Sequence, residues 1–136
     1  NSSGPAAMLR GIHDQFRAAS AQLMRFVAQA NAPATERLFA QLANVLHHHH
    51  HAEEDMLFPF VHRRTGIAPA QLQTDHDEMT AAISQVERAL DASHGVGEAI
   101  TAFHDILIAH LDREEALVMP VLLEVPPDEL WAQLHS

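Results

Sequence analysis

The sequence has 136 residues, 47% of them hydrophobic, and no cysteine. This length is enough for one domain with its own core, and the missing thiols exclude disulfides, zinc–thiolate sites and iron–sulfur clusters. Acidic residues outnumber lysine plus arginine by 18 to 8, which argues against a nucleic-acid partner because phosphate binding needs a basic face. No apolar run is long enough to cross a bilayer, so we expect no membrane partner.

Apolar residues recur at three- and four-residue steps in four segments, which predicts four amphipathic helices. The first covers roughly residues 6–30. The second begins near Thr35, a candidate N-cap, and ends at Pro59, which lacks the backbone N–H that a helix needs. The third follows the apolar seam of residues 72–90, and the fourth begins after Gly97.

Short connections between these helices predict an all-α fold, an up-down-up-down four-helix bundle. We expect a single domain over residues 1–136, with the bundle at roughly 6–123. The tail at 126–135 carries spaced leucines and a tryptophan, which predicts a short C-terminal helix that caps one end of the core. The N-terminus lacks an initiating methionine and a signal pattern and reads as a trimmed lead-in. We expect a cytoplasmic protein.

One motif occurs twice in the chain, as LHHHHHAEEDMLFPF and as LIAHLDREEALVMPV. An offset of 61 residues superposes His49 on His110 and Glu53 on Glu114. Each histidine precedes its glutamate by four residues, so a helix places both side chains on one face. The repeat predicts a duplicated helical hairpin.

The repeat extends to an earlier pair of histidines, His13 and His76, each followed by an aspartate. Counted from the ends of the helices, the polar residues of the four seams fall at one level. Burying them unpaired would be costly, so we expect a cation among them. Glu54 and Glu115 are rotated away and are expected behind the ligands or at the surface. The expected metal ligands are His13, His49, Glu53, His76, His110 and Glu114.

The type of metal follows from these donors. Imidazole with carboxylate suits iron, manganese or zinc, and two carboxylates that face each other across a bundle are placed to bridge two cations. Two ions, each with two imidazoles and a share of both carboxylates, fit the internal symmetry of the chain.

The run of five histidines cannot supply five ligands, because each helical residue turns about 100° from the last. His47, His48 and His51 are expected at the surface or behind the ligands. The register of the repeat favours His49 as the ligand, and His50 remains the alternative.

The pattern H…H-x-x-x-E…H…H-x-x-x-E, with EExxLFP after the second helix, resembles the hemerythrin-like (HHE cation-binding) domains over roughly residues 8–123. The resemblance implies a non-heme di-iron centre, oxo- or hydroxo-bridged, inside a four-helix bundle. It assigns His13 and His49 to one iron, His76 and His110 to the other, and Glu53 and Glu114 as bridges.

Oxygen-carrying members of that family have a second histidine in the third helix, four residues after the first, and this chain has Thr80 there. The iron at His76 would then lack a third imidazole, and both irons would keep an exchangeable position. The resemblance implies a small-molecule ligand such as dioxygen, nitric oxide or peroxide. Two alternatives stay open: a catalase-like enzyme that disproportionates hydrogen peroxide in oxidative or nitrosative stress, and an iron or oxygen sensor. The sequence does not indicate the oligomeric state.

Overall fold

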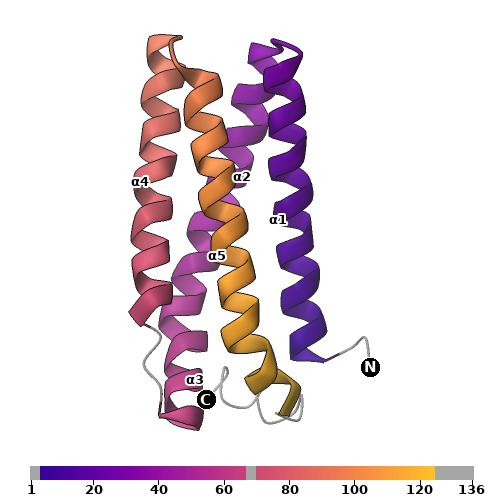
Figure 1. The fold of residues 1–136 in the computed structure, drawn as a ribbon, viewed down its shortest axis with the longest axis vertical. Coiled ribbons are helices and arrows are strands. Elements are labelled where there is room, and N and C mark those ends of the chain that lie inside the picture. The colour runs from indigo at the N-terminus through magenta and orange to yellow at the C-terminus, as the bar shows by residue number, and fades with distance from the viewer. Residues whose placement is uncertain (1–3, 67–69, 125–136) are drawn as a thin grey trace.

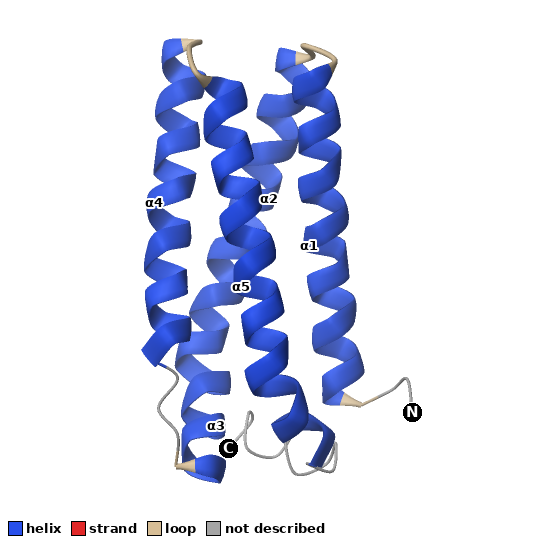
Figure 2. Cartoon of the chain, in the orientation of Figure 1, coloured by secondary structure: helices blue, strands red, loops and turns tan. Residues whose placement is uncertain are grey.

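A computed structural model describes residues 4–66 and 70–124, and the elements in these two ranges are all helical (Figures 1 and 2). The predicted all-α bundle is therefore confirmed, whereas the expected C-terminal helix at 126–135 lies outside the described residues. The elements are α1 (Pro5–Ala28), α2 (Ala32–Ala52), the π-helix η1 (Glu53–Leu57), α3 (Phe58–Thr65), α4 (Ala70–Ala92) and α5 (Val96–Glu124).

The four long helices α1, α2, α4 and α5 run side by side along the long axis of the molecule (Figure 1). The α1–α2 and α4–α5 turns lie at one end, and α3 lies at the other. Helix α5 packs closely against both α1 and α4, while α2 and α4 touch each other little. The bundle is therefore more open between α2 and α4 than on its other sides.

The start of α2 differs from the sequence prediction by one helical turn. Asn31 is the N-cap, and its side-chain oxygen accepts a hydrogen bond from the backbone N–H of Ala34 at 3.2 Å. Thr35, the predicted cap, lies inside the helix and its hydroxyl donates to the Asn31 carbonyl. Pro33 fits in the first turn because no helical partner is needed for its nitrogen there.

The prediction that Pro59 ends the second helix is wrong. The chain passes from α2 through the π-helix η1 into α3, which continues to Thr65 and stops at Gly66, where φ is +74°. In η1 the backbone N–H of Phe58 bonds to the carbonyl of Glu53, five residues back. A wider turn relieves the clash that a proline ring makes with the preceding turn of an α-helix. The helical direction is thus kept across the motif.

Two hydrophobic clusters fill the bundle, one toward each end. The cluster nearer the hairpin turns contains Leu23, Phe39 and Phe103, all at most 1% exposed. The cluster beside α3 contains Phe58 and Phe60 with other apolar residues of α1, α4 and α5. Each such buried side chain stabilises the fold by about 1.5–3 kcal/mol. The polar residues described next lie between these clusters.

Candidate metal centre

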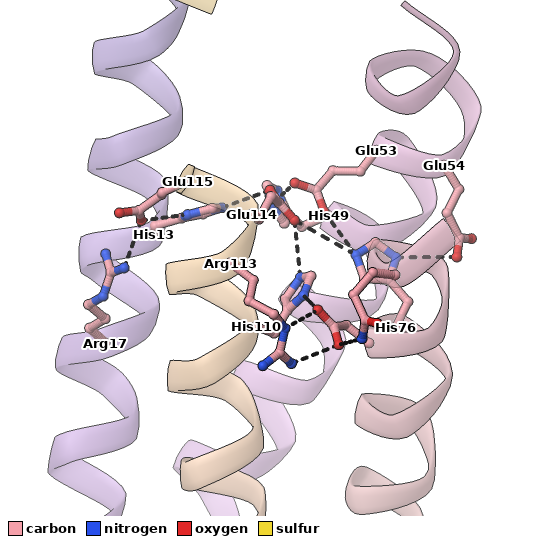
Figure 3. Close-up of polar contacts among 12 residues, drawn as sticks. His13, Arg17, His49, Glu53, Glu54, His76, His110, Arg113, Glu114 and Glu115 are labelled. Carbon is pink, nitrogen blue, oxygen red and sulfur yellow. Dashed lines mark hydrogen bonds and ion pairs between the residues drawn. The ribbon is translucent and has the colours of Figure 1, made fainter. Parts of the chain in front are cut away.

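The six residues expected as ligands lie close together inside the bundle (Figure 3). His13, Glu114 and His110 are at most 1% exposed, and His49 is the most accessible of the six, with 14% of its side chain exposed. The donors come from every long helix and from η1: His13 from α1, His49 from α2, Glu53 from η1, His76 from α4, and His110 and Glu114 from α5. We call these six residues, together with His50, the histidine–carboxylate layer.

One half of the layer, the two-imidazole pocket, contains His13, His49, Glu53 and Glu114, whose donor atoms all lie within 4.8 Å of one another. His13 Nε2 is 3.1 Å from Glu114 Oε1, and His49 Nε2 is 3.0 Å from Glu53 Oε2. The second contact spans one helical turn, as the spacing of the motif requires.

The other half, the three-imidazole pocket, contains His50, His76, His110 and Glu53. His76 Nε2 is 3.1 Å from Glu53 Oε1, and His110 Nε2 is 3.1 Å from Glu114 Oε2. Each of these two glutamates therefore approaches a histidine of each pocket. They lie where bridging ligands between two ions would lie.

His50 corrects the sequence interpretation, because the structure places both His49 and His50 in the layer, one in each pocket. His50 reaches from α2 to His76 and His110, so a third imidazole lies where the sequence predicted that one would be missing. Thr80 is not among the clustered ligand-type residues; it lines the cavity between α2 and α4, and its hydroxyl donates to the His76 carbonyl. The spacing of α2 could have indicated that His50 faces inward, because Leu42, Leu46 and His50 recur every four residues. All three are buried in the structure.

The layer also holds an unusual concentration of unpaired polar atoms. In the described part of the chain, nine buried side-chain nitrogen and oxygen atoms have no hydrogen-bond partner. They are the Nε2 atoms of five histidines and the four carboxylate oxygens of Glu53 and Glu114. The nitrogens and oxygens approach to about 3 Å without the alignment of a hydrogen bond. Each unpaired buried group costs about 1–3 kcal/mol, and a cation between them removes that cost.

The charges that these residues carry without metal are set by burial and by each other. Burial opposes charging of His76, but the nearby carboxylates of Glu114 and Glu53 raise its pKa to about 9. Burial lowers the pKa of His50 to about 2, with His76 and His110 adding to the effect. Burial and the nearby Glu114 raise the pKa of Glu53. The metal-free layer therefore holds protons that a cation would displace.

A second set of carboxylates contacts three of the histidines at Nδ1, the ring nitrogen that faces away from the layer. His13 Nδ1 lies 2.8 Å from Glu115 Oε2, and Arg17 lies 2.8 Å from the same oxygen (Figure 3). His76 Nδ1 lies 3.2 Å from Glu54 Oε1. In a neutral imidazole, donation from Nδ1–H to a carboxylate leaves Nε2 free of a proton and aimed inward, which is how proteins orient metal-binding histidines. The glutamate that follows each motif glutamate has this role here.

Asp75 orients His110 in the same way, by contact with its Nδ1 atom. The sequence pattern did not predict this role. Its Oδ2 lies 3.3 Å from His110 Nδ1, and Arg113 pairs with both Asp75 oxygens at 2.9 and 2.7 Å. Burial opposes ionisation, but Arg113, Gln71 and His110 together lower the pKa of Asp75. The completely buried carboxylate is thus ionised and fixed in place.

Two separate openings reach the layer. An apolar pocket of about 170 Å³ reaches His49 and Glu53 between α1 and the end of α2, and Leu9, Ile12 and Leu57 line it. A larger cavity of about 950 Å³ between α2 and α4, which we call the α2–α4 groove, reaches His50 and His76. Each pocket of the layer therefore has its own approach.

The chain matches the hemerythrin HHE cation-binding domain over residues 4–122. It belongs to this family. No curated protein and no solved structure matches it significantly. Membership makes the chain a cation-binding helical protein, and its buried histidine and glutamate groups are where a hemerythrin domain could hold the ion. None of its described helices is long and apolar enough to cross a membrane.

Proposed function

We propose that this hemerythrin-like chain holds two iron ions in its two pockets and binds dioxygen or a related small diatomic molecule beside the two-imidazole pocket. Glu53 and Glu114 would be shared by both ions, together with a bridging solvent oxygen. When bound, a pair of ferrous ions supplies the electrons that dioxygen accepts reversibly. The residues that would hold them are His13, His49, His50, His76, His110, Glu53 and Glu114.

The inequality of the two pockets carries this proposal. In the three-imidazole pocket, three nitrogens and one oxygen from each shared glutamate give five protein donors. A bridging solvent oxygen completes the six positions of an octahedral ion. The two-imidazole pocket has one donor fewer. An exchangeable position is thus expected at one ion only, which is what a binding protein needs.

The apolar pocket supports a neutral ligand at that position. It adjoins His49 and Glu53, and its other walls are apolar side chains that include Leu9, Ile12 and Leu57. Such walls offer water few hydrogen bonds and disfavour a charged species. A small neutral molecule such as dioxygen or nitric oxide can enter without a comparable cost.

Disproportionation of hydrogen peroxide is the second candidate function, which the sequence kept as an alternative because of Thr80. That argument required an exchangeable position on both irons. His50 lies in the pocket where the imidazole was expected to be missing, so the geometry favours ligand binding over peroxide turnover.

The test begins with the metal content and the optical spectrum of the iron-loaded protein. We expect two irons per chain, one for each group of ligands, and an absorption change that appears with dioxygen and reverses under vacuum through several cycles. A chain that holds a single zinc, or that evolves oxygen from peroxide without reversible binding, would refute the proposal.

A substitution in the apolar pocket separates ligand access from metal content. Ile12→Phe narrows the pocket beside His49 and should slow association of the diatomic ligand by about tenfold while two irons remain bound. Ile106→Phe is the matched control, because Ile106 packs against the core and does not line this pocket. Equal rates in both variants would mean that the ligand enters elsewhere.

A further inference from the structure

Three members of the histidine run have no place in the proposed centre, yet two of them share one surface. His47 and His51 line the α2–α4 groove, whereas His48 does not. They are four residues apart on α2, and two imidazoles at that spacing on a helix can hold a divalent cation. Asp55 continues the same face, with its Oδ2 3.0 Å from His51 Nε2.

Polar groups from α4 and η1 form a continuous chain from the rim of the groove to the three-imidazole pocket. The side-chain amide of Gln73 donates to Asp77 Oδ1 at 3.4 Å and to Glu54 Oε1 at 2.7 Å. Glu54 Oε1 in turn lies 3.2 Å from His76 Nδ1. An ion in the groove therefore meets oxygen atoms from the surface to the buried layer.

The groove is strongly acidic. Five carboxylates line it, and no lysine or arginine is found among the described residues of its walls. The whole chain has a formal net charge of −10, so the field of the protein adds to the attraction. A cleft lined by one sign of charge concentrates ions of the other sign. The five carboxylates belong to Glu36, Glu54, Asp77, Glu87 and Asp91.

The inner end of the groove contains a buried group without a partner. His50 lines the groove, is only 8% exposed, and has an Nε2 atom with no hydrogen bond. His76, at 2% exposure, lies beside it with the two rings stacked. The acidic walls thus lead to imidazole nitrogen that a cation would satisfy.

The other opening is unsuitable for a cation. An ion that passes Leu9, Ile12 and Leu57 would lose its water without receiving other oxygen or nitrogen ligands, and that desolvation is costly. The groove offers such ligands in its carboxylates and in His47, His51 and His76. The two openings therefore select different species, a neutral molecule on one side and a cation on the other.

We propose that ferrous iron enters the buried centre through the α2–α4 groove, with His47 and His51 as its first protein ligands, and reaches the three-imidazole pocket before the other. The destination of this route rests on the proposed function, but its entrance is a separate cation site. Its residues accelerate loading and take no part in the finished centre.

The test measures iron uptake in the absence of oxygen. Metal-free protein is mixed with ferrous iron and a chromophoric ferrous chelator, and the transfer of iron is followed by stopped flow. We expect His47→Ala/His51→Ala to slow uptake by about tenfold at low salt. Asp77→Asn/Glu87→Gln should slow it and weaken its salt dependence. Both variants should still reach two irons per chain, one for each ligand group.

His48→Ala is the matched control, since His48 is an exposed member of the same run outside the groove. It should load at the wild-type rate, and circular dichroism should show the same helicity in all variants. Wild-type uptake rates in the groove variants would refute the route while leaving the centre intact. A lower final iron content would also overturn it, because His47 and His51 would then be permanent ligands. A wild-type chain that takes up no iron would instead refute the proposed function.

Discussion

Replacing His50 with leucine should stabilise the metal-free protein and at the same time remove one metal ion. The side chain is buried beside His76 and His110 and has an unpaired Nε2. Leucine has a similar volume and no polar atom. At pH 7 we expect the metal-free chain to gain about 1–3 kcal/mol, the usual cost of an unsatisfied buried polar group.

The gain should be larger in acid. Burial lowers the pKa of His50 from its ordinary 6.5 to about 2, so below pH 6.5 the unfolded chain takes up a proton that the folded chain does not. Stability linked to His50 is therefore complete above pH 6.5 and is lost as the pH falls. At pH 5 the loss is about 2 kcal/mol, which His50→Leu abolishes. For a chain of this size that corresponds to about 7 °C in Tm.

Thermal unfolding of the metal-free proteins at pH 5 and pH 7 measures the effect, and iron quantification measures the metal. His48→Leu is the control, because His48 is exposed and should show no such pH dependence. The reasoning would be refuted if His50→Leu destabilised the chain equally at both pH values and still bound two irons. His50 would then be a packing residue, and the proposed inequality of the two pockets would disappear.

Three further outcomes are expected, each measured as metal affinity by chelator competition. Asp75→Asn should weaken metal binding by about tenfold to a hundredfold, because the Asp75 carboxylate holds the His110 ring in place. Unchanged metal affinity would show that the His110 ring does not need this carboxylate for its orientation. Glu115→Gln should weaken metal binding by about tenfold, whereas Asp112→Asn, at an exposed position, should not. Equal losses of affinity in both variants would mean that the overall negative charge of the protein, and not the Glu115 side chain itself, is responsible. Affinity should also rise by about tenfold per pH unit up to pH 9, because the proton of His76, with its pKa raised to about 9, must leave; a flat profile between pH 7 and 8.5 would contradict this.

The sequence by itself determined what depends on helical periodicity. Glu53 lies four residues after His49, and Glu114 four after His110, and both pairs are in contact in the structure, at 3.0 and 3.1 Å. Contacts one turn apart follow from the geometry of a helix whatever surrounds it. The repeat likewise indicated two hairpins, and the apolar seams indicated a bundle with a polar layer.

The tertiary structure decided how each helix is rotated about its axis and which residues of different helices meet. The repeat favoured His49 over His50, but the packing of α2 places both in the layer, and it leaves Thr80 outside. The contact of Glu115 with His13 joins residues 102 positions apart. A rotation of a fraction of a turn exchanges neighbouring residues between core and surface, and the packing of all the helices together fixes that rotation. Local periodicity places a ligand on a helix face, but only the assembled bundle determines the number of imidazoles in each pocket.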